Sequence, residues 1–181
     1  AVILSPVAQP LAADYPTGRV TLVVPFPAGG STDLVARLLA QHLSAVWKQS
    51  VIVDNKPGGN AMLGPTFVAK SAPDGHTLLI GPPTIATAHA TMKVMPIDPL
   101  KDLSPISQLV EIPFVITINA ALPFKTLREL IDYAKANPGK LNSGTFAMGS
   151  TLTSSQFNAA AGVNMPTVGY RGEALMMAAA A

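Results

Sequence analysis

The apolar positions in the first half of the chain predict three strands alternating with two helices. Val20–Val24 is a continuous apolar and β-branched run, which is typical of a strand covered on both faces. From Leu34 to Val46, apolar residues recur at spacings of three and four, as on an amphipathic helix. The predicted elements are, in order, a strand over 20–24, a helix from about 31 to 47, a strand over 51–53, a helix over 62–71 and a strand over 77–80. This order predicts an α/β fold with a parallel sheet and right-handed crossovers.

The same alternation restarts in the second half of the chain. Phe114–Ile118 predicts a strand, and Thr126 with Glu129 forms a capping box that opens a helix. Leu141–Ser143 then begins another strand, and a helix is expected over Thr151–Ala161. A second α/β lobe therefore follows the first.

The restart divides the chain into lobes that we expect at residues 14–102 and 103–181. The proline-rich residues 81–105 are expected to form a loop and the crossover between the lobes. Residues 1–13 are apolar, uncharged and end in small residues, so they resemble the back half of a secretory signal, and an N-terminal tail is the alternative. Residues 173–181 look like a helix just beginning, and the first lobe lacks closing elements, so we expect a chain incomplete at its C-terminus.

The composition then limits the classes of function. Hydrophobic residues make up 49% of the 181 residues, enough to bury a core. Charged residues make up only 12%, against about 25% in an average soluble domain, and the formal net charge is +2. Lysines and arginines are scattered, which argues against a nucleic-acid partner. The lack of cysteine excludes disulfide scaffolds, zinc–thiolate sites and thiol catalysis.

Metals and nucleotide cofactors are not predicted either. His42, His76 and His89 do not have the spacing of metal ligands. The glycine-containing loops do not match the dinucleotide fingerprint, and Pro65 stands where a phosphate-binding P-loop has its lysine. We therefore expect no metal and no cofactor.

Two junctions between a strand and a helix form the candidate binding site. At Val24–Asp33 and at Ser143–Thr153, an apolar strand leads through a turn rich in glycine, serine and threonine into a helix. The first amide groups of such a helix lack intrahelical acceptors, and the helix dipole favours an anion there. Ordinary N-capping is the alternative for either junction. Two such junctions in consecutive α/β lobes favour a shared cleft for a small carboxylate.

Single residues in these junctions have two interpretations. Asp33 either orients the cleft or binds a substrate ammonium, or it stabilises the start of its helix, which we favour because it would repel a carboxylate. Phe26, Phe146 and Met148 either line the apolar flank of a ligand or pack within their loops. An enzyme acting on a small carboxylated substrate in the same cleft stays open as the alternative function.

The segment Val20–Asp33, VTLVVPFPAGGSTD, closely resembles the first strand and ligand loop of the substrate-binding receptors of tripartite tricarboxylate transporters, the Bug family. The resemblance continues in VIVDNKPGGN (Val51–Asn60), SAPDGHTLLIG (Ser71–Gly81) and PFKTLRELIDYAKANPGKLNSG (Pro123–Gly144), and it covers about residues 15–172. It implies the two-lobed α/β fold of a type II periplasmic binding protein. It also implies a small carboxylate between the lobes.

The resemblance further implies a periplasmic receptor, not an enzyme, that delivers its solute to the subunits of an ion-coupled membrane permease. We expect a monomer whose lobes close about the crossover. The family's ligand loops match Phe26–Asp33 and Ala147–Thr153, with a third contact region at Pro82–Thr84. The candidate ligand-binding residues are Phe26, Ala28, Gly29, Gly30, Ser31, Thr32, Asp33, Pro83, Thr84, Ala147, Met148, Gly149, Ser150, Thr151 and Thr153. The second loop lacks the histidine that the family often has near Thr153, so the identity of the carboxylate stays open.

Overall fold

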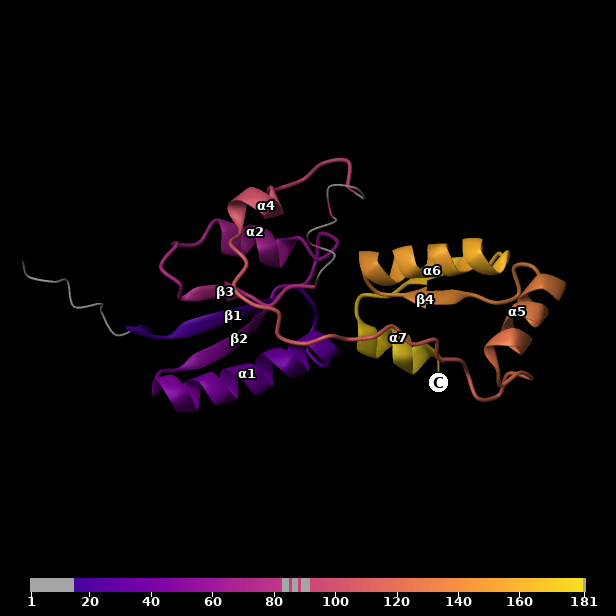
Figure 1. The fold of residues 1–181 in the computed structure, drawn as a ribbon, viewed down its shortest axis with the longest axis horizontal. Coiled ribbons are helices and arrows are strands. Elements are labelled where there is room, and N and C mark those ends of the chain that lie inside the picture. Colours follow the sequence, from indigo (N-terminus) through magenta and orange to yellow (C-terminus); the bar gives the residue numbers. More distant parts are fainter. Residues whose placement is uncertain (1–14, 83–84, 86–87, 89–91, 181) are drawn as a thin grey trace, which may run out of the picture.

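Two α/β units lie one after the other along the long axis of the molecule, the first in indigo and magenta and the second in orange and yellow (Figure 1). The structure is a computed structural model that describes residues 15–82, 85, 88 and 92–180, so the expected secretory segment, residues 1–13, lies outside it. Among the described residues, no helix is long and apolar enough to cross a membrane. The elements are β1 (Val20–Val24), α1 (Ser31–Trp47), β2 (Val51–Asn55), α2 (Leu63–Ala69), β3 (Thr77–Leu79), α4 (Pro99–Asp102), α5 (Leu127–Ala136), β4 (Ser143–Thr145), α6 (Met148–Ala161), β5 (Thr167–Gly169) and α7 (Glu173–Ala180).

The sheet of the first unit is parallel, with the strand order β2-β1-β3. β1 pairs with β2 from Val20 opposite Val51, and with β3 from Thr21 opposite Thr77. As the central strand, β1 is covered on both faces, and its valines and its leucine are fully buried. The predicted β-α-β-α-β unit is confirmed.

Helices α1 and α2 lie on opposite faces of this sheet (Figure 1). On the face of α1, Leu22 packs in a core that includes Ala40. On the other face, Gly64 lets α2 approach β1 closely, because a Cβ at this position would lie 3.1 Å from Cβ of Pro25 and 3.4 Å from Cγ1 of Val23. The two helices therefore fix the end of β1, where the first junction begins.

The apolar stripe predicted on α1 is only partly buried. Ala36 and Ala40 are its buried apolar residues, whereas the side chains of Leu34 and Leu38 are 60% and 59% exposed. Small residues let the helix lie close to the sheet, and the larger leucines then project away from it. Because apolar residues occupy more than one face of α1, spacing alone does not identify the face that packs.

The second unit is built on a smaller parallel sheet, in which Ser143 of β4 lies opposite Thr167 of β5. Helices α6 and α7 flank β4 from opposite sides, and α5 lies at the far end of the molecule (Figure 1). The capping box of α5 is confirmed, because Oγ1 of Thr126 accepts a hydrogen bond from the amide of Glu129 and Oε2 of Glu129 accepts one from the amide of Thr126. Amide hydrogen bonds from Lys125 and Thr126 lower the pKa of Glu129.

The strand predicted over Phe114–Ile118 is wrong. Residues 103–119 have no regular structure and run from the first unit toward α5 (Figure 1). Phe114 and Val115 are 66% and 76% exposed. A strand needs a neighbour to pair its backbone groups, and no described strand pairs with this segment. We expected the crossover within the proline-rich residues 81–105. It lies mostly after them.

Strand β4 and helix α6 are displaced from their predicted bounds. β4 occupies 143–145 and so begins at the end of the predicted start, Leu141–Ser143, and α6 begins at Met148 rather than Thr151. The helix starts early because Oγ of Ser150 accepts hydrogen bonds from the amides of Phe146 and Ala147, at 3.0 and 3.2 Å. Neither α4 nor β5 is predicted, since elements of four and three residues are too short to show a period.

Candidate functional site

The N-terminus of α1 holds a carboxylate that comes from the second unit. Oε2 of Glu173, the first residue of α7, accepts hydrogen bonds from the amide of Ser31 at 2.9 Å and from its Oγ at 2.8 Å. The N-cap of α1 is Gly30, and its lack of a side chain leaves this end open, since a Cβ there would lie 3.4 Å from Oε2 of Glu173. Ser31 therefore does not cap the helix with its hydroxyl, which donates to Glu173 instead. The helix dipole favours the negative charge at this place.

Asp33 fastens the loop that precedes α1. Its Oδ2 accepts hydrogen bonds from the amide of Gly29 at 3.0 Å and from Nε of Arg37 at 2.9 Å, and its Oδ1 accepts one from Nδ2 of Asn55 at 2.9 Å. The hydrogen bond from Arg37, supported by those from Gly29 and Asn55, lowers the pKa of Asp33 to about 2 against the effect of desolvation. Both carboxylate oxygens are engaged within the protein, and the side chain is only 5% exposed. This geometry is that of a residue that positions the loop.

The backbone of this loop depends on Gly29 and Asn55. Gly29 has a φ of 92°, a conformation that residues with a Cβ rarely adopt. Nδ2 of Asn55, at the end of β2, also donates a hydrogen bond to the carbonyl of Phe26 at 3.0 Å. The neighbouring strand therefore holds the loop in place.

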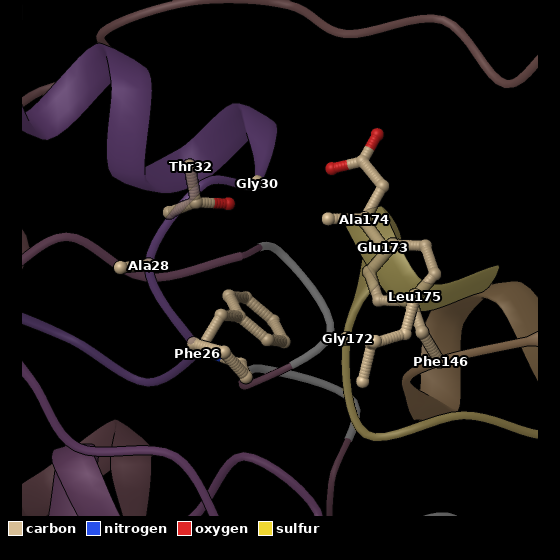
Figure 2. A pocket seen from close by; sticks show the side chains of 10 residues that line it. Phe26, Ala28, Gly30, Thr32, Phe146, Gly172, Glu173, Ala174 and Leu175 are labelled. Atoms are coloured by element: carbon tan, nitrogen blue, oxygen red, sulfur yellow. The ribbon is translucent and has the colours of Figure 1, made fainter. Parts of the chain in front are cut away.

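A cavity of about 70 Å³ lies between the two units beside the contact of Ser31 with Glu173. Figure 2 shows the Phe26 ring and the Thr32 hydroxyl on one side of it, and Glu173 and Leu175 on the other. The rings of Phe26 and Phe146 meet edge to face across the units, with centroids 6.3 Å apart. A wider, open hollow of about 420 Å³ shares Gly30, Glu173 and Ala174 with this cavity.

The hydroxyl groups at the start of α6 are directed to the helix's own backbone. Oγ of Ser150 and Oγ1 of Thr151 donate hydrogen bonds to the carbonyl of Ala147, at 2.8 and 3.1 Å. Oγ1 of Thr153 donates to the carbonyl of Gly149 at 2.9 Å. Because these protons are engaged, the second junction offers an anion the backbone of its first turn rather than its hydroxyls.

The candidate ligand-binding residues fall into four groups in the structure. Those that line the cavity are Phe26, Ala28, Gly30 and Thr32. Those that line the wider hollow, besides Gly30, are Gly29, Ser31 and Asp33. Those at the start of α6 that line neither are Ala147, Met148, Gly149, Ser150, Thr151 and Thr153. Pro83 and Thr84 lie outside the described residues.

The wall formed by Gly172–Leu175 is absent from the sequence-based candidates. An acidic residue in the first turn of a helix is common, so Glu173 gives no signal of a further role. Its contact with Ser31 joins residues 142 positions apart, which no local pattern encodes. Gly172 allows the close approach, because a Cβ there would lie 3.1 Å from Cγ of Pro27.

Among the described residues, no group of three histidine, aspartate or glutamate side chains is placed to hold a metal ion. His76 instead stacks edge to face on Tyr15, with ring centroids 5.6 Å apart, and its Nδ1 lies 3.4 Å from Oδ1 of Asp74. His89 lies outside the described residues.

Known proteins match the chain over most of its length. Residues 35–181 match the family model described as the tripartite tricarboxylate transporter family receptor. Protein BugT of Bordetella pertussis is 36% identical over 171 residues, which are 92% of this chain and 52% of BugT. R. palustris Rpa4515, solved with adipate, is 38% identical with a TM-score of 0.89, over 92% of this chain and 57% of that one. The periplasmic binding protein BugD is 33% identical with a TM-score of 0.82, over 92% of this chain and 56% of that one.

The similarity is extensive in this chain but partial in its relatives. The chain spans about half the length of the curated relatives it matches. The solved structures share the α/β architecture of both units, as expected from the sequence. Because the match to the family model begins inside α1 and runs to residue 181, the chain belongs to the tripartite tricarboxylate transporter receptor family.

Proposed function

We propose that this protein is a receptor that binds a small carboxylate between its two units and is not an enzyme. The observation that carries the proposal is the hydrogen bonding of the Ser31 amide and hydroxyl to the carboxylate of Glu173, because a helix start of this kind, at α1 as at α6, is suited to hold a carboxylate. Rpa4515, with its bound adipate, supports a carboxylate as the class of ligand.

The binding site would combine both junctions. The start of α6 supplies backbone amides to the solute carboxylate, and the start of α1, whose Ser31 amide and hydroxyl hold Glu173, bounds the other end of the solute. Phe26 and Phe146 flank the apolar part of the solute, and Thr32 offers a hydroxyl that has no hydrogen bond to a described residue. Asp33 holds the loop in shape rather than contacting the solute. Pro83 and Thr84 form the third contact region.

The receptor would act in the periplasm as a monomer and deliver its solute to an ion-coupled permease. The family description and the periplasmic relative BugD support this location and partner. In this proposal the lobes comprise residues 14–102 and 103–181. Their closure about the segment 103–119 would present a combined surface to the permease.

Calorimetry of the full-length protein against a panel of mono- and dicarboxylates tests this function. We expect binding of at least one carboxylate, and loss of that binding in Gly149→Val, because a branched side chain obstructs the first turn of α6. The matched control is Gly18→Val, which lies outside both junctions in open space and is expected to retain affinity. A folded protein that binds no carboxylate, or that converts one into a product, contradicts the proposal.

A further inference from the structure

We propose that Glu173 is a specificity-determining residue of the carboxylate site. Its carboxylate fills the position at the start of α1 and disfavours a solute that brings a second carboxylate to that end. The inference rests on the proposed function, because it concerns the choice among carboxylates in the same site. It assigns the class of solute as a carboxylate whose far end is uncharged or carries a hydrogen-bond donor.

The donors at the start of α1 are already engaged by one oxygen. The amide and the Oγ of Ser31 both donate to Oε2 of Glu173, at 2.9 and 2.8 Å. A solute carboxylate that used the same donors would place two negative charges within a few ångströms of each other. Two carboxylates that share a site repel, so one must leave or take up a proton. A solute with a neutral end leaves the contact of Glu173 with Ser31 intact.

The backbone that carries Glu173 has close neighbours on both sides. On one side, Gly172 lies against Pro27, where a Cβ on the glycine would be 3.1 Å from Cγ of the proline. On the other side, α7 packs on β4, where a Cβ on Gly144 would lie 2.9 Å from Cγ of Met176. A dicarboxylate that uses the donors of Ser31 must therefore displace the Glu173 side chain against its two hydrogen bonds.

The surroundings of Glu173 favour a donor group on the solute. The nearby Thr32 hydroxyl lines the same cavity and both donates and accepts hydrogen bonds. Arg37, the cation that lines the adjoining hollow, already donates to Asp33 and Asn55. The α1 end of the site thus has a carboxylate acceptor in place, and the arginine that lines the adjoining hollow is bound to other partners.

Calorimetry with hexanoate and adipate tests the proposal, because the two solutes share a six-carbon chain and differ by one carboxylate. We measure both affinities for the full-length wild type, for Glu173→Gln and for Glu111→Gln. Glu173→Gln removes the charge at nearly constant shape and is expected to raise the affinity for adipate by about tenfold, with little change for hexanoate. Glu111→Gln removes a charge from the exposed segment outside the cavity and is expected to change neither affinity.

The outcomes separate this inference from the proposed function. Unchanged affinities in Glu173→Gln, or equal changes for both solutes, overturn the role of Glu173 and leave the receptor function standing. A folded wild type that binds neither these two solutes nor any other carboxylate overturns both. The amide resonance of Ser31 gives a second readout without solute: it is expected to shift in Glu173→Gln but not in Glu111→Gln. An unmoved resonance contradicts the contact itself.

Discussion

At the scale of single residues, Asp33 governs the shape of the candidate site. It joins the loop, its own helix and the neighbouring strand through hydrogen bonds with Gly29, Arg37 and Asn55. A buried carboxylate with three donors is stabilised in its charged form, and its removal leaves those donors without an acceptor. The residue therefore contributes to binding through the loop that it holds.

Asp33→Asn is expected to lower the free energy of unfolding by about 1–3 kcal/mol, because the amide cannot accept from all three donors as the carboxylate does. Urea unfolding measures the change. Asp102→Asn, in the short exposed helix α4, is the control and is expected to cost less. A value for Asp33→Asn within error of the wild type would contradict the positioning role.

The same residue predicts a dependence of stability on pH. The pKa of Asp33 is about 2 in the folded protein and 3.8 in the reference state, so the carboxylate stabilises the fold above about pH 4. As the pH falls from about 4 to 2, the carboxylate takes up a proton and about 2 kcal/mol of stability is lost. Unfolding by urea across this range should show a steeper loss for the wild type than for Asp33→Asn. Parallel curves would refute the lowered pKa.

At the scale of the elements, the close contact of α2 with β1 determines where the first junction lies. Gly64 faces Pro25, which directly follows β1 and starts the loop. Pro25 and Pro65 are both fully buried, so this contact is part of the core. A side chain at position 64 would push α2 away from the strand end that carries the site.

Gly64→Ala is expected to destabilise the protein by about 1–2 kcal/mol, because overpacking against the Pro25 backbone outweighs the higher helix propensity of alanine. Thermal unfolding measures this effect. Gly18→Ala, with no atom within 4 Å of its added methyl group, is the matched control and is expected to be nearly neutral. A stabilised Gly64→Ala would mean that α2 moves aside without cost.

At the scale of the whole molecule, the two units meet through contacts made by both junctions. Phe26 and Phe146 meet edge to face, Glu173 reaches Ser31, and the chain crosses between the units along residues 103–119. The contact of Glu173 with Ser31 depends on the charge of the carboxylate, whereas the contact of the two phenylalanine rings does not depend on charge. The aromatic contact joins the loops that precede α1 and α6.

The aromatic contact predicts coupling between the units. In a double-mutant cycle of Phe26→Ala and Phe146→Ala, we expect a coupling energy of about 0.5–1.5 kcal/mol in the free energy of unfolding, as for edge-to-face ring pairs. The pair Phe124 and Tyr133, with centroids 5.1 Å apart within the second unit, is the reference for an aromatic contact that does not join the units. Additive effects of the two substitutions would show that the units are not coupled through these rings.

The sequence by itself determined what depends on neighbours in the chain. The buried run of β1 predicts a central strand, and the pair Thr126 and Glu129 predicts the start of α5, because strand burial and helix capping are encoded within a few residues. The glycine and hydroxyl loops at the two strand ends predict junctions suited to an anion, and the structure places both at the interface of the units.

Only the tertiary structure decided what depends on distant partners. Phe114–Ile118 has the composition of a strand but no described strand to pair with, and backbone pairing cannot be read from one segment. Likewise, α1 is apolar on several faces, and its packing against the sheet selected the face with small residues. In the sequence, Glu173 is an ordinary acidic residue at a helix start. Only the fold brings it into contact with Ser31, which lies 142 positions earlier in the chain. The sequence predicts the start of α1 as a site for the carboxylate of a solute. In the structure, this helix start binds the carboxylate of Glu173.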